Sequence, residues 1–126
     1  MKFGIATLLL VSGAAFAQNP LPATSREIGQ LFAALESSRC EFHRNGSWHS
    51  AQKASEHLHQ KYDYLLEKGL VTSTESFIEL AATKSSMTGK PYLVRCGNAQ
   101  PVPSMSWFTS KLKELRARPA DANSSE

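Results

Sequence analysis

This chain of 126 residues carries 14 Lys and Arg residues against 11 Asp and Glu residues, which gives a formal net charge of +3 and an isoelectric point of about 9.0. The basic residues are spread along the chain, and this excludes the clustered basic face typical of nucleic-acid-binding proteins. The length suits one small domain with a modest core, and no internal repeat is visible, so we expect neither a second domain nor a nucleic-acid partner.

Residues 1–17 have the pattern of a secretory signal peptide. Lys2 supplies the positive start, residues 5–11 form an apolar core, and an A-x-A cleavage site ends at Ala17. The apolar run is too short to cross a bilayer as a helix, and no cysteine follows it to carry a lipid. We therefore expect cleavage near Ala17 and a periplasmic or secreted protein without a transmembrane segment.

Residues 18–23 are predicted to be a mobile segment ahead of a single domain over residues 24–118. The residues Thr24 to Glu27 match a capping box, in which a hydroxyl and a carboxylate bond to free helix amides, so a first helix should begin here. Apolar residues then recur with helical spacing, which predicts one buried stripe. The stripe consists of Ile28, Leu31, Phe32 and Leu35.

The stretch from Cys40 to His49 predicts a β-hairpin. Its turn is Asn45-Gly46, and both residues tolerate the positive φ angles that a two-residue hairpin loop requires. Such a short loop fixes the register of the two strands. The predicted pairs are Arg44 with Ser47, His43 with Trp48, and Phe42 with His49.

A second helix is predicted from an N-cap at Ser50 to Lys68, with Gly69 ending it in the left-handed conformation. Its buried side comprises Ala51, Ala54, Leu58, Tyr62 and Leu65. A separate stripe of His57, Lys61 and Tyr64 runs along one flank. His59 lies roughly 200° around the helix from His57, so the two histidines cannot chelate one ion.

A second capping box, Thr72 to Glu75, predicts a third helix ending near Lys84. Its inward residues are Phe77, Ile78, Ala81 and Ala82. Beyond it we expect a loop over residues 85–90, a strand from Pro91 to Cys96 and an irregular segment from Gly97 to Ser106. A last helix over residues 106–116 should bury Phe108, Leu112 and Leu115 with Trp107 at its margin, and residues 119–126 should form a disordered tail.

These elements predict an α+β fold in which a three-stranded antiparallel sheet, the hairpin plus one strand, packs against about four helices. An exported chain with two cysteines most simply forms one disulfide, here between Cys40 and Cys96. Closing this long loop stabilises the fold by roughly 4 kcal/mol in the chain-entropy model. Metal ligation through Cys40 and His43 is the alternative, but no further cysteine pair supports it, and we predict neither a metal nor a cofactor.

Two stretches carry a resemblance to a known family: FHRNGSWHSAQKASEHLHQKY and TSTESFIELAATKSSMTGKPYLVRC. With the spacing between them, they are similar to the YfeK-like family of small exported bacterial proteins, which is filed under a domain of unknown function. The resemblance covers about residues 25–96, and its most specific pieces are Arg44-Asn45-Gly46, His57-Leu58 with Lys61, and Ser85-Ser86 through Tyr92. It implies a bacterial envelope location, but no activity or catalytic residue.

The loop from Ser85 to Lys90 allows three interpretations. It can be a turn in which Ser side chains bond to nearby backbone amides and Gly89 takes a positive φ angle. It can instead be a ligand loop whose hydroxyls, backbone N–H groups and Lys90 meet an anion or a sugar. Catalysis by Ser85 or Ser86 would need a base and a third orienting group, and the loop matches no Ser-x-x-Lys, P-loop or nucleophile-elbow motif.

The histidines of interest are His49 and His57. Lys61 follows His57 at i+4, so their like charges should depress the pKa of His57 and favour a neutral imidazole that can bind a ligand or act as a base. Alternatively, both histidines hydrogen-bond the loop around Ser85. Trp48 and His43 share one face of the hairpin, either as packing or as a ligand platform.

The leading hypothesis is an exported, non-catalytic binding module for an unknown envelope protein or a small polar or anionic ligand. The candidate binding residues are Arg44, Asn45, Trp48, His49, His57, Lys61, Ser85, Ser86, Thr88, Gly89, Lys90 and Tyr92. One alternative is inhibition of a lysozyme-type cell-wall-degrading enzyme, because Thr88-Gly89-Lys90-Pro91-Tyr92 resembles the Ser-Gly-x-x-Tyr loop of some periplasmic lysozyme inhibitors. The other alternative is a Ser/His hydrolase.

Overall fold

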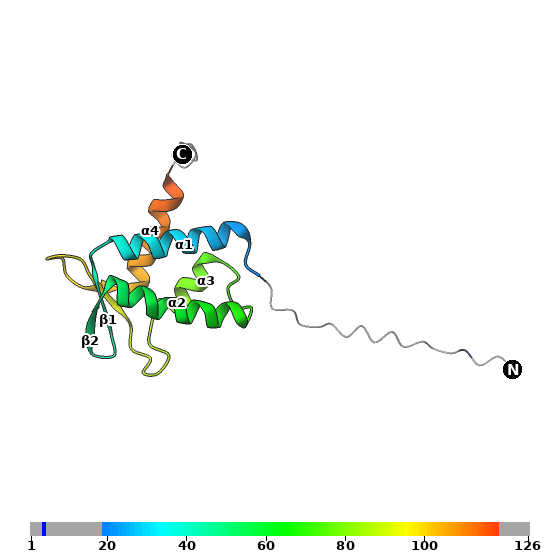
Figure 1. Ribbon diagram of the computed structural model, residues 1–126, viewed down its shortest axis with the longest axis horizontal. Helices are drawn as coiled ribbons and strands as arrows, with labels where there is room; N and C mark the ends of the chain where they lie inside the picture. Colours follow the sequence, from blue (N-terminus) through cyan, green and yellow to red (C-terminus); the bar gives the residue numbers. More distant parts are fainter. Residues whose placement is uncertain (1–3, 5–18, 119–126) are drawn as a thin grey trace.

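A computed structural model describes Gly4 and residues 19–118 of the chain (Figure 1). The predicted signal peptide, apart from Gly4, and the predicted tail over residues 119–126 lie outside the described residues. The elements are α1 (Pro22–Ser37), β1 (Glu41–Arg44), β2 (Ser47–Ser50), α2 (Ala51–Glu67), α3 (Thr74–Ala81), β3 (Leu93–Arg95), β4 (Val102–Pro103) and α4 (Ser104–Ala117). None of the described helices is long and apolar enough to cross a membrane.

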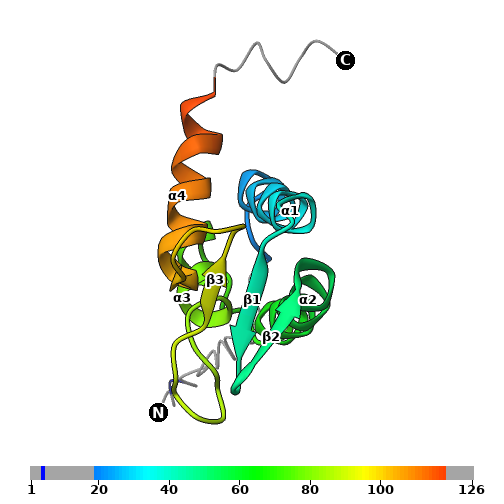
Figure 2. The same cartoon turned by 90° about the vertical axis from the view of Figure 1, so that its left-hand side faces the viewer.

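The strands form one antiparallel sheet in the order β2-β1-β3-β4. The sheet stands at one end of the molecule, and Figure 2 shows its strands in front with the helices behind them. Phe42 and Val94 pair across β1 and β3 and are fully buried toward the helices. Residues 19–118 therefore confirm the predicted α+β fold with about four helices, and its core lies between the sheet and the helix layer.

The predicted number of strands is wrong, because the sheet has a fourth strand. β4 lies in the segment that the sequence predicted to be irregular, and it pairs with β3 through Leu93 with Pro103 and Val94 with Val102. Proline cannot donate a ladder hydrogen bond, but an edge strand tolerates it because one of its sides has no neighbour. Val102 and Pro103 thus form a strand only because β3 provides the pairing partner.

The hairpin register is confirmed pair by pair, with Phe42 opposite His49, His43 opposite Trp48 and Arg44 opposite Ser47. In the turn, Asn45 has a φ angle of 50° and Gly46 a φ angle of 84°. Both values lie in the left-handed region that the Asn-Gly turn was predicted to use.

The helix ends confirm one predicted cap and correct two others. The Ser50 side chain accepts a hydrogen bond from the Lys53 amide at the start of α2, as predicted. α1 begins at Pro22, before the predicted capping box, because proline suits the first turn of a helix, where its missing N–H costs nothing. At α3 the reciprocal cap is formed by Ser73 and Ser76 rather than by Thr72 and Glu75.

Three further element boundaries differ from the predictions. α3 ends at Ala81 rather than near Lys84, β3 spans Leu93–Arg95 only, and α4 begins two residues earlier than predicted. Trp107 was placed at the margin of the last helix, yet its side chain is only 8% exposed. The remaining core matches the predicted stripes of the four helices, with Tyr62 and Leu115 partly buried against it.

Glu27, which the sequence assigned to a helix cap, instead joins three helices. Its carboxylate accepts a hydrogen bond from the Thr74 hydroxyl at 2.6 Å and pairs with Arg116, which also pairs with Glu75. The Arg116 and Thr74 hydrogen bonds lower the pKa of Glu27 to about 2 despite an opposing effect of burial. This network ties the end of α4 to α1 and α3.

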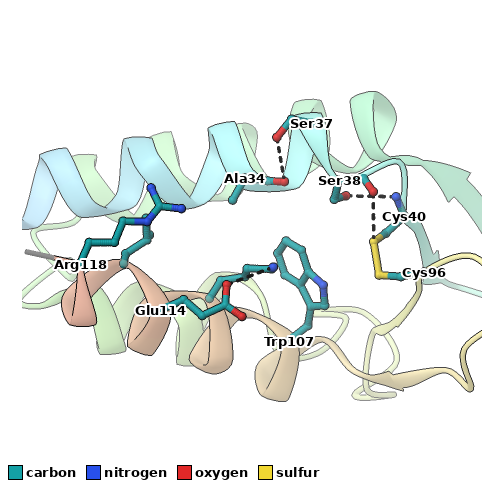
Figure 3. A pocket seen from close by; sticks show the side chains of 10 residues that line it. Ala34, Ser37, Ser38, Cys40, Cys96, Trp107, Glu114 and Arg118 are labelled. Atoms are coloured by element: carbon teal, nitrogen blue, oxygen red, sulfur yellow. Dashed lines mark hydrogen bonds and ion pairs between the residues drawn. A yellow bond between two sulfur atoms is a disulfide. The ribbon is translucent and has the colours of Figure 1, made fainter. Parts of the chain in front are cut away.

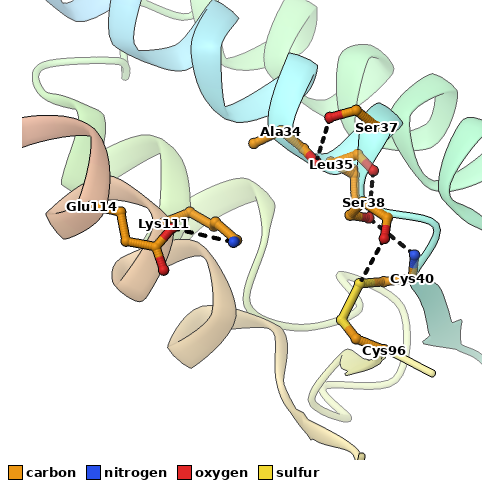
Figure 4. Close-up of a disulfide and its surroundings, with 8 residues drawn as sticks. All are labelled: Ala34, Leu35, Ser37, Ser38, Cys40, Cys96, Lys111 and Glu114. Atoms are coloured by element: carbon orange, nitrogen blue, oxygen red, sulfur yellow. Dashed lines mark hydrogen bonds and ion pairs between the residues drawn. A yellow bond between two sulfur atoms is a disulfide. The ribbon is translucent and has the colours of Figure 1, made fainter. Parts of the chain in front are cut away.

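The predicted disulfide between Cys40 and Cys96 is present, with Cα atoms 4.2 Å apart (Figure 4). It joins the chain just after α1 to the chain just after β3. Cys40 is 5% exposed, so its sulfur belongs to the core as well as to the cross-link.

Candidate functional site

Five of the predicted binding residues gather where α2 packs against the sheet, and we call them the donor cluster: Arg44, His49, His57, Lys61 and Tyr92. His57 and Lys61 lie one turn apart on α2. Arg44 and His49 come from the two hairpin strands, and Tyr92 directly precedes β3. Side chains alternate along a strand, so Arg44 shares the helix-facing side of β1 with the buried Phe42.

Tyr92 is the centre of the donor cluster. Its side chain is 2% exposed and packs on Phe42, with ring centroids 5.0 Å apart. The Tyr92 hydroxyl lies 3.1 Å from Nε2 of His57 and 3.2 Å from Nζ of Lys61. Lys61 donates a second hydrogen bond, 3.1 Å long, to the carbonyl oxygen of Lys84. Tyr92 therefore fixes both polar side chains of α2 against the sheet.

One arrangement of the protons in this network lets the Tyr92 hydroxyl both accept and donate a hydrogen bond. An ammonium can only donate, so Lys61 gives a proton to the Tyr92 oxygen. The Tyr92 hydroxyl is then free to donate to Nε2 of His57, which accepts only if the imidazole is neutral. In this arrangement His57 carries its proton on Nδ1, and that N–H has no protein acceptor among the hydrogen bonds of residues 19–118.

The electrostatics agree with a neutral His57. Burial, followed by the charges of Arg44, Lys61 and His49, lowers the pKa of His57 to about 4. Burial also lowers the pKa of Lys61 and raises the pKa of Tyr92. The predicted depression of the His57 pKa is confirmed, but burial contributes more than the neighbouring lysine does.

The donor cluster has an excess of positive charge. The ion pairs within residues 19–118 join Arg95 to Glu41, Lys111 to Glu114, and Arg116 to both Glu27 and Glu75. In this part of the chain, no carboxylate pairs with Arg44 or Lys61. The cluster therefore presents hydrogen-bond donors and cations without a matching protein anion.

The adjacent loop is a self-contained turn. The Ser85 hydroxyl accepts hydrogen bonds from the amides of Met87 and Thr88, both 3.2 Å long. The Gly89 amide donates to the Ser85 carbonyl at 2.9 Å, and Gly89 has a φ angle of 72°. The turn interpretation is confirmed for Ser85 and Gly89, whereas Ser86, Thr88 and Lys90 stay exposed on the loop that projects beyond α2 in Figure 1.

Two predicted arrangements of the histidines are not observed. His57 bonds to Tyr92 rather than to the turn around Ser85, because Tyr92 is held inward by the sheet. No hydrogen bond in the described part of the chain joins Ser85 or Ser86 to a histidine, so the dyad that a Ser/His hydrolase needs is not formed there.

Trp48 and Asn45 lie apart from the donor cluster. Trp48 and His43 occupy the outer face of the hairpin, with ring centroids 4.9 Å apart. The guanidinium of Arg95 lies 4.0 Å from the centroid of the Trp48 ring and pairs with Glu41. The Trp48 ring is thus already covered on this face by packing, and Asn45 is exposed in the turn.

Sequence reasoning missed a hollow of about 430 Å³ between α1 and α4, lined by Trp107 and the disulfide (Figure 3). Most of its polar side chains have partners: Ser38 donates to the Leu35 carbonyl at 2.6 Å, and Lys111 pairs with Glu114, whereas Arg118 forms no ion pair within residues 19–118. Because few free polar groups converge there, this hollow is a weaker site candidate than the donor cluster. Trp107 was the residue that could have indicated this hollow, because it lines it. The helical projection, however, placed Trp107 only at the margin of the apolar side of the last helix.

Metal binding finds no support in the described residues, where no three His, Cys, Asp or Glu side chains are arranged to hold an ion. His59 lies apart from His57, as predicted, and stacks on Phe32 with ring centroids 3.6 Å apart.

The comparisons with known proteins place the chain in a family but assign it no activity. Neither the curated proteins nor the solved structures contain a match. Residues 22–116 match the family described as Family of unknown function (DUF5329), and this match begins with α1 and ends one residue before the end of α4. The chain therefore belongs to the DUF5329 family.

Proposed function

We propose that this protein is an exported, non-catalytic binding module whose donor cluster holds a small anion. The observation that supports this proposal is the accumulation of Arg44, Lys61 and His57 without a carboxylate partner in the described part of the chain. The charges of Arg44 and Lys61 both lower the pKa of His57, so the cluster disfavours a further positive charge. A bound carboxylate or phosphate would supply the negative charge that the cluster lacks.

The donors that remain free suit an oxyanion. Lys61 uses two of its three N–H groups on Tyr92 and Lys84, so one is left for a ligand. The Arg44 guanidinium offers a planar pair of N–H groups that matches the two oxygens of a carboxylate or phosphate. The Nδ1–H of His57 adds a neutral donor. A ligand therefore needs to supply only acceptors.

Export is part of the proposal. The A-x-A pattern that ends at Ala17 supports cleavage of a signal peptide. The disulfide between Cys40 and Cys96 supports an oxidising compartment. The resemblance to the YfeK-like family favours the bacterial envelope, where the ligand would be a small solute or an acidic group on an envelope protein.

Anion binding is tested by isothermal titration calorimetry of the protein with inorganic phosphate and with acetate. Arg44→Gln should weaken binding about tenfold, since it removes the cation that has no other partner. Lys113→Gln is the matched control, because Lys113 is exposed on α4, away from the donor cluster. Equal affinity in the wild type and Arg44→Gln would overturn the proposal.

Inhibition of a lysozyme-type enzyme is the second candidate. The support is the exposed loop, where Met87 is 90% exposed at the tip and the Ser85 hydroxyl accepts hydrogen bonds from two backbone amides. Tyr92, the last residue of the resembling motif, is buried, so only the tip could enter an enzyme cleft. Micromolar protein that fails to slow lysozymes of several types would end this candidate.

A further inference from the structure

A groove between α2, α3 and the loop lies beside the donor cluster, and we call it the α2–α3 groove. Its lining residues are Gln60, Lys61, Tyr64, Leu65, Leu80 and Ser86. Tyr64 and Leu80 are 57% and 45% exposed, although both are large apolar side chains. Exposed apolar side chains that converge on one groove indicate a place where apolar ligand surface can be buried.

Lys61 connects the groove with the donor cluster. Its side chain lines the groove, while its ammonium group bonds to Tyr92 and Lys84. Lysine often buries its methylene stem against apolar surface and keeps its charge at the edge. The two sites therefore meet at one ammonium group and can accept one molecule that has both an anionic and an apolar part.

The size and charge of the groove limit what can occupy it. Its volume is about 290 Å³, at the lower end of the range for small-molecule sites. The lining contains one cation and no carboxylate. On the loop side, the exposed Lys84 and Lys90 add two further cations, whereas the exposed Glu67 and Glu79 lie on the helices. The cations therefore stand on the side of the groove that faces Lys61, where we expect a negatively charged group of a ligand.

We propose that the ligand is a small amphipathic monocarboxylate, with its carboxylate at Lys61, on the edge of the donor cluster, and a short aliphatic or aromatic part in the α2–α3 groove. This inference rests on the proposed anion site and specifies the rest of the molecule. Tyr64, Leu65 and Leu80 would contact the apolar part. Ser86, which is exposed on the loop, also lines the groove.

Three probes separate the two parts of the ligand: acetate has only the acid group, octanol only the alkyl chain, and octanoate both. Calorimetric titration should give octanoate an affinity at least tenfold higher than that of either acetate or octanol, because each buried methylene adds favourable transfer free energy. Equal affinities for acetate and octanoate would overturn this inference and leave the anion site intact. Absence of binding by acetate, phosphate and octanoate would overturn both proposals.

Variants locate the alkyl chain. Leu80→Ser and Tyr64→Ser should each weaken octanoate at least fivefold more than they weaken acetate, since both side chains line the groove. Leu21→Ser is the matched control, because Leu21 is 69% exposed at the start of α1. Thermal melts establish that each variant is folded. If both groove variants bind octanoate as tightly as the wild type does, the alkyl chain of octanoate lies outside the groove and the inference is wrong.

Discussion

Replacement of Tyr92 by Phe tests whether the Tyr92 hydroxyl organises the donor cluster. Phenylalanine keeps the ring that packs on Phe42, so the substitution opens no cavity and removes only the hydroxyl. That hydroxyl makes one hydrogen bond to neutral His57 and one to the Lys61 ammonium. A neutral hydrogen bond contributes about 1 kcal/mol and one to a charged group about 1.5–3 kcal/mol, so we expect a loss of about 2 kcal/mol after relaxation.

The assay is urea unfolding, with a thermal melt as a second measurement. A loss of about 2 kcal/mol in a domain of this size should lower the melting temperature by about 10 °C. Tyr64→Phe is the control, because the Tyr64 side chain is 57% exposed. Removal of its hydroxyl should lower the free energy of unfolding by less than about 0.5 kcal/mol. If Tyr92→Phe is as stable as Tyr64→Phe, the hydrogen-bond network does not hold the cluster together.

Four further predictions follow from the structure. The folded-state pKa of His57 lies below the ordinary value of 6.5, so the unfolded chain binds more protons between pH 6.5 and about pH 4. Stability should therefore fall by about 1–3 kcal/mol as the pH drops through this window, and His57→Gln should remove that fall while His43→Gln should not. Glu27, with a pKa lowered to about 2, stabilises the fold above pH 4.5 and loses this effect as the pH falls toward 2. Glu27→Gln should lower the free energy of unfolding by about 1–3 kcal/mol at neutral pH in urea unfolding. An unchanged free energy of unfolding would refute the three-helix network. Ser104→Ala should be neutral or stabilising by about 1 kcal/mol, because the Ser104 hydroxyl is buried with no partner in the described structure; clear destabilisation would mean that the hydroxyl is satisfied. Thiol titration of unreduced, denatured protein should detect no free thiol, and two free thiols would contradict the disulfide.

Local sequence patterns predicted the features that depend on one element. The hairpin register follows from the two-residue Asn45-Gly46 turn, and the stripe of His57 and Lys61 follows from helical spacing. The residues that cap α3 could not be identified from the sequence, because Thr72, Ser73 and Thr74 are consecutive hydroxyl residues at its start. The chain uses Ser73 and Ser76, and no local rule ranks them above Thr72 and Glu75.

Features that depend on distant partners were not predictable. β4 exists because β3 is present to pair with it, and nothing in its two residues predicts a strand. Tyr92 stood among the candidate residues, but its contact with His57 joins residues 35 positions apart and requires the sheet to dock on α2. The α2–α3 groove likewise forms only when Leu80 of α3 meets Tyr64 of α2.

The central claim is that the donor cluster binds an anion next to a neutral His57. The most direct measurement is a pH titration of the His57 ring by NMR, with and without saturating octanoate. We expect a pKa of about 4 in the free protein, and a higher pKa when a carboxylate lies beside the imidazole, because an opposite charge favours the protonated form. An ordinary pKa in the free protein, or the same pKa with and without the ligand, would contradict the account.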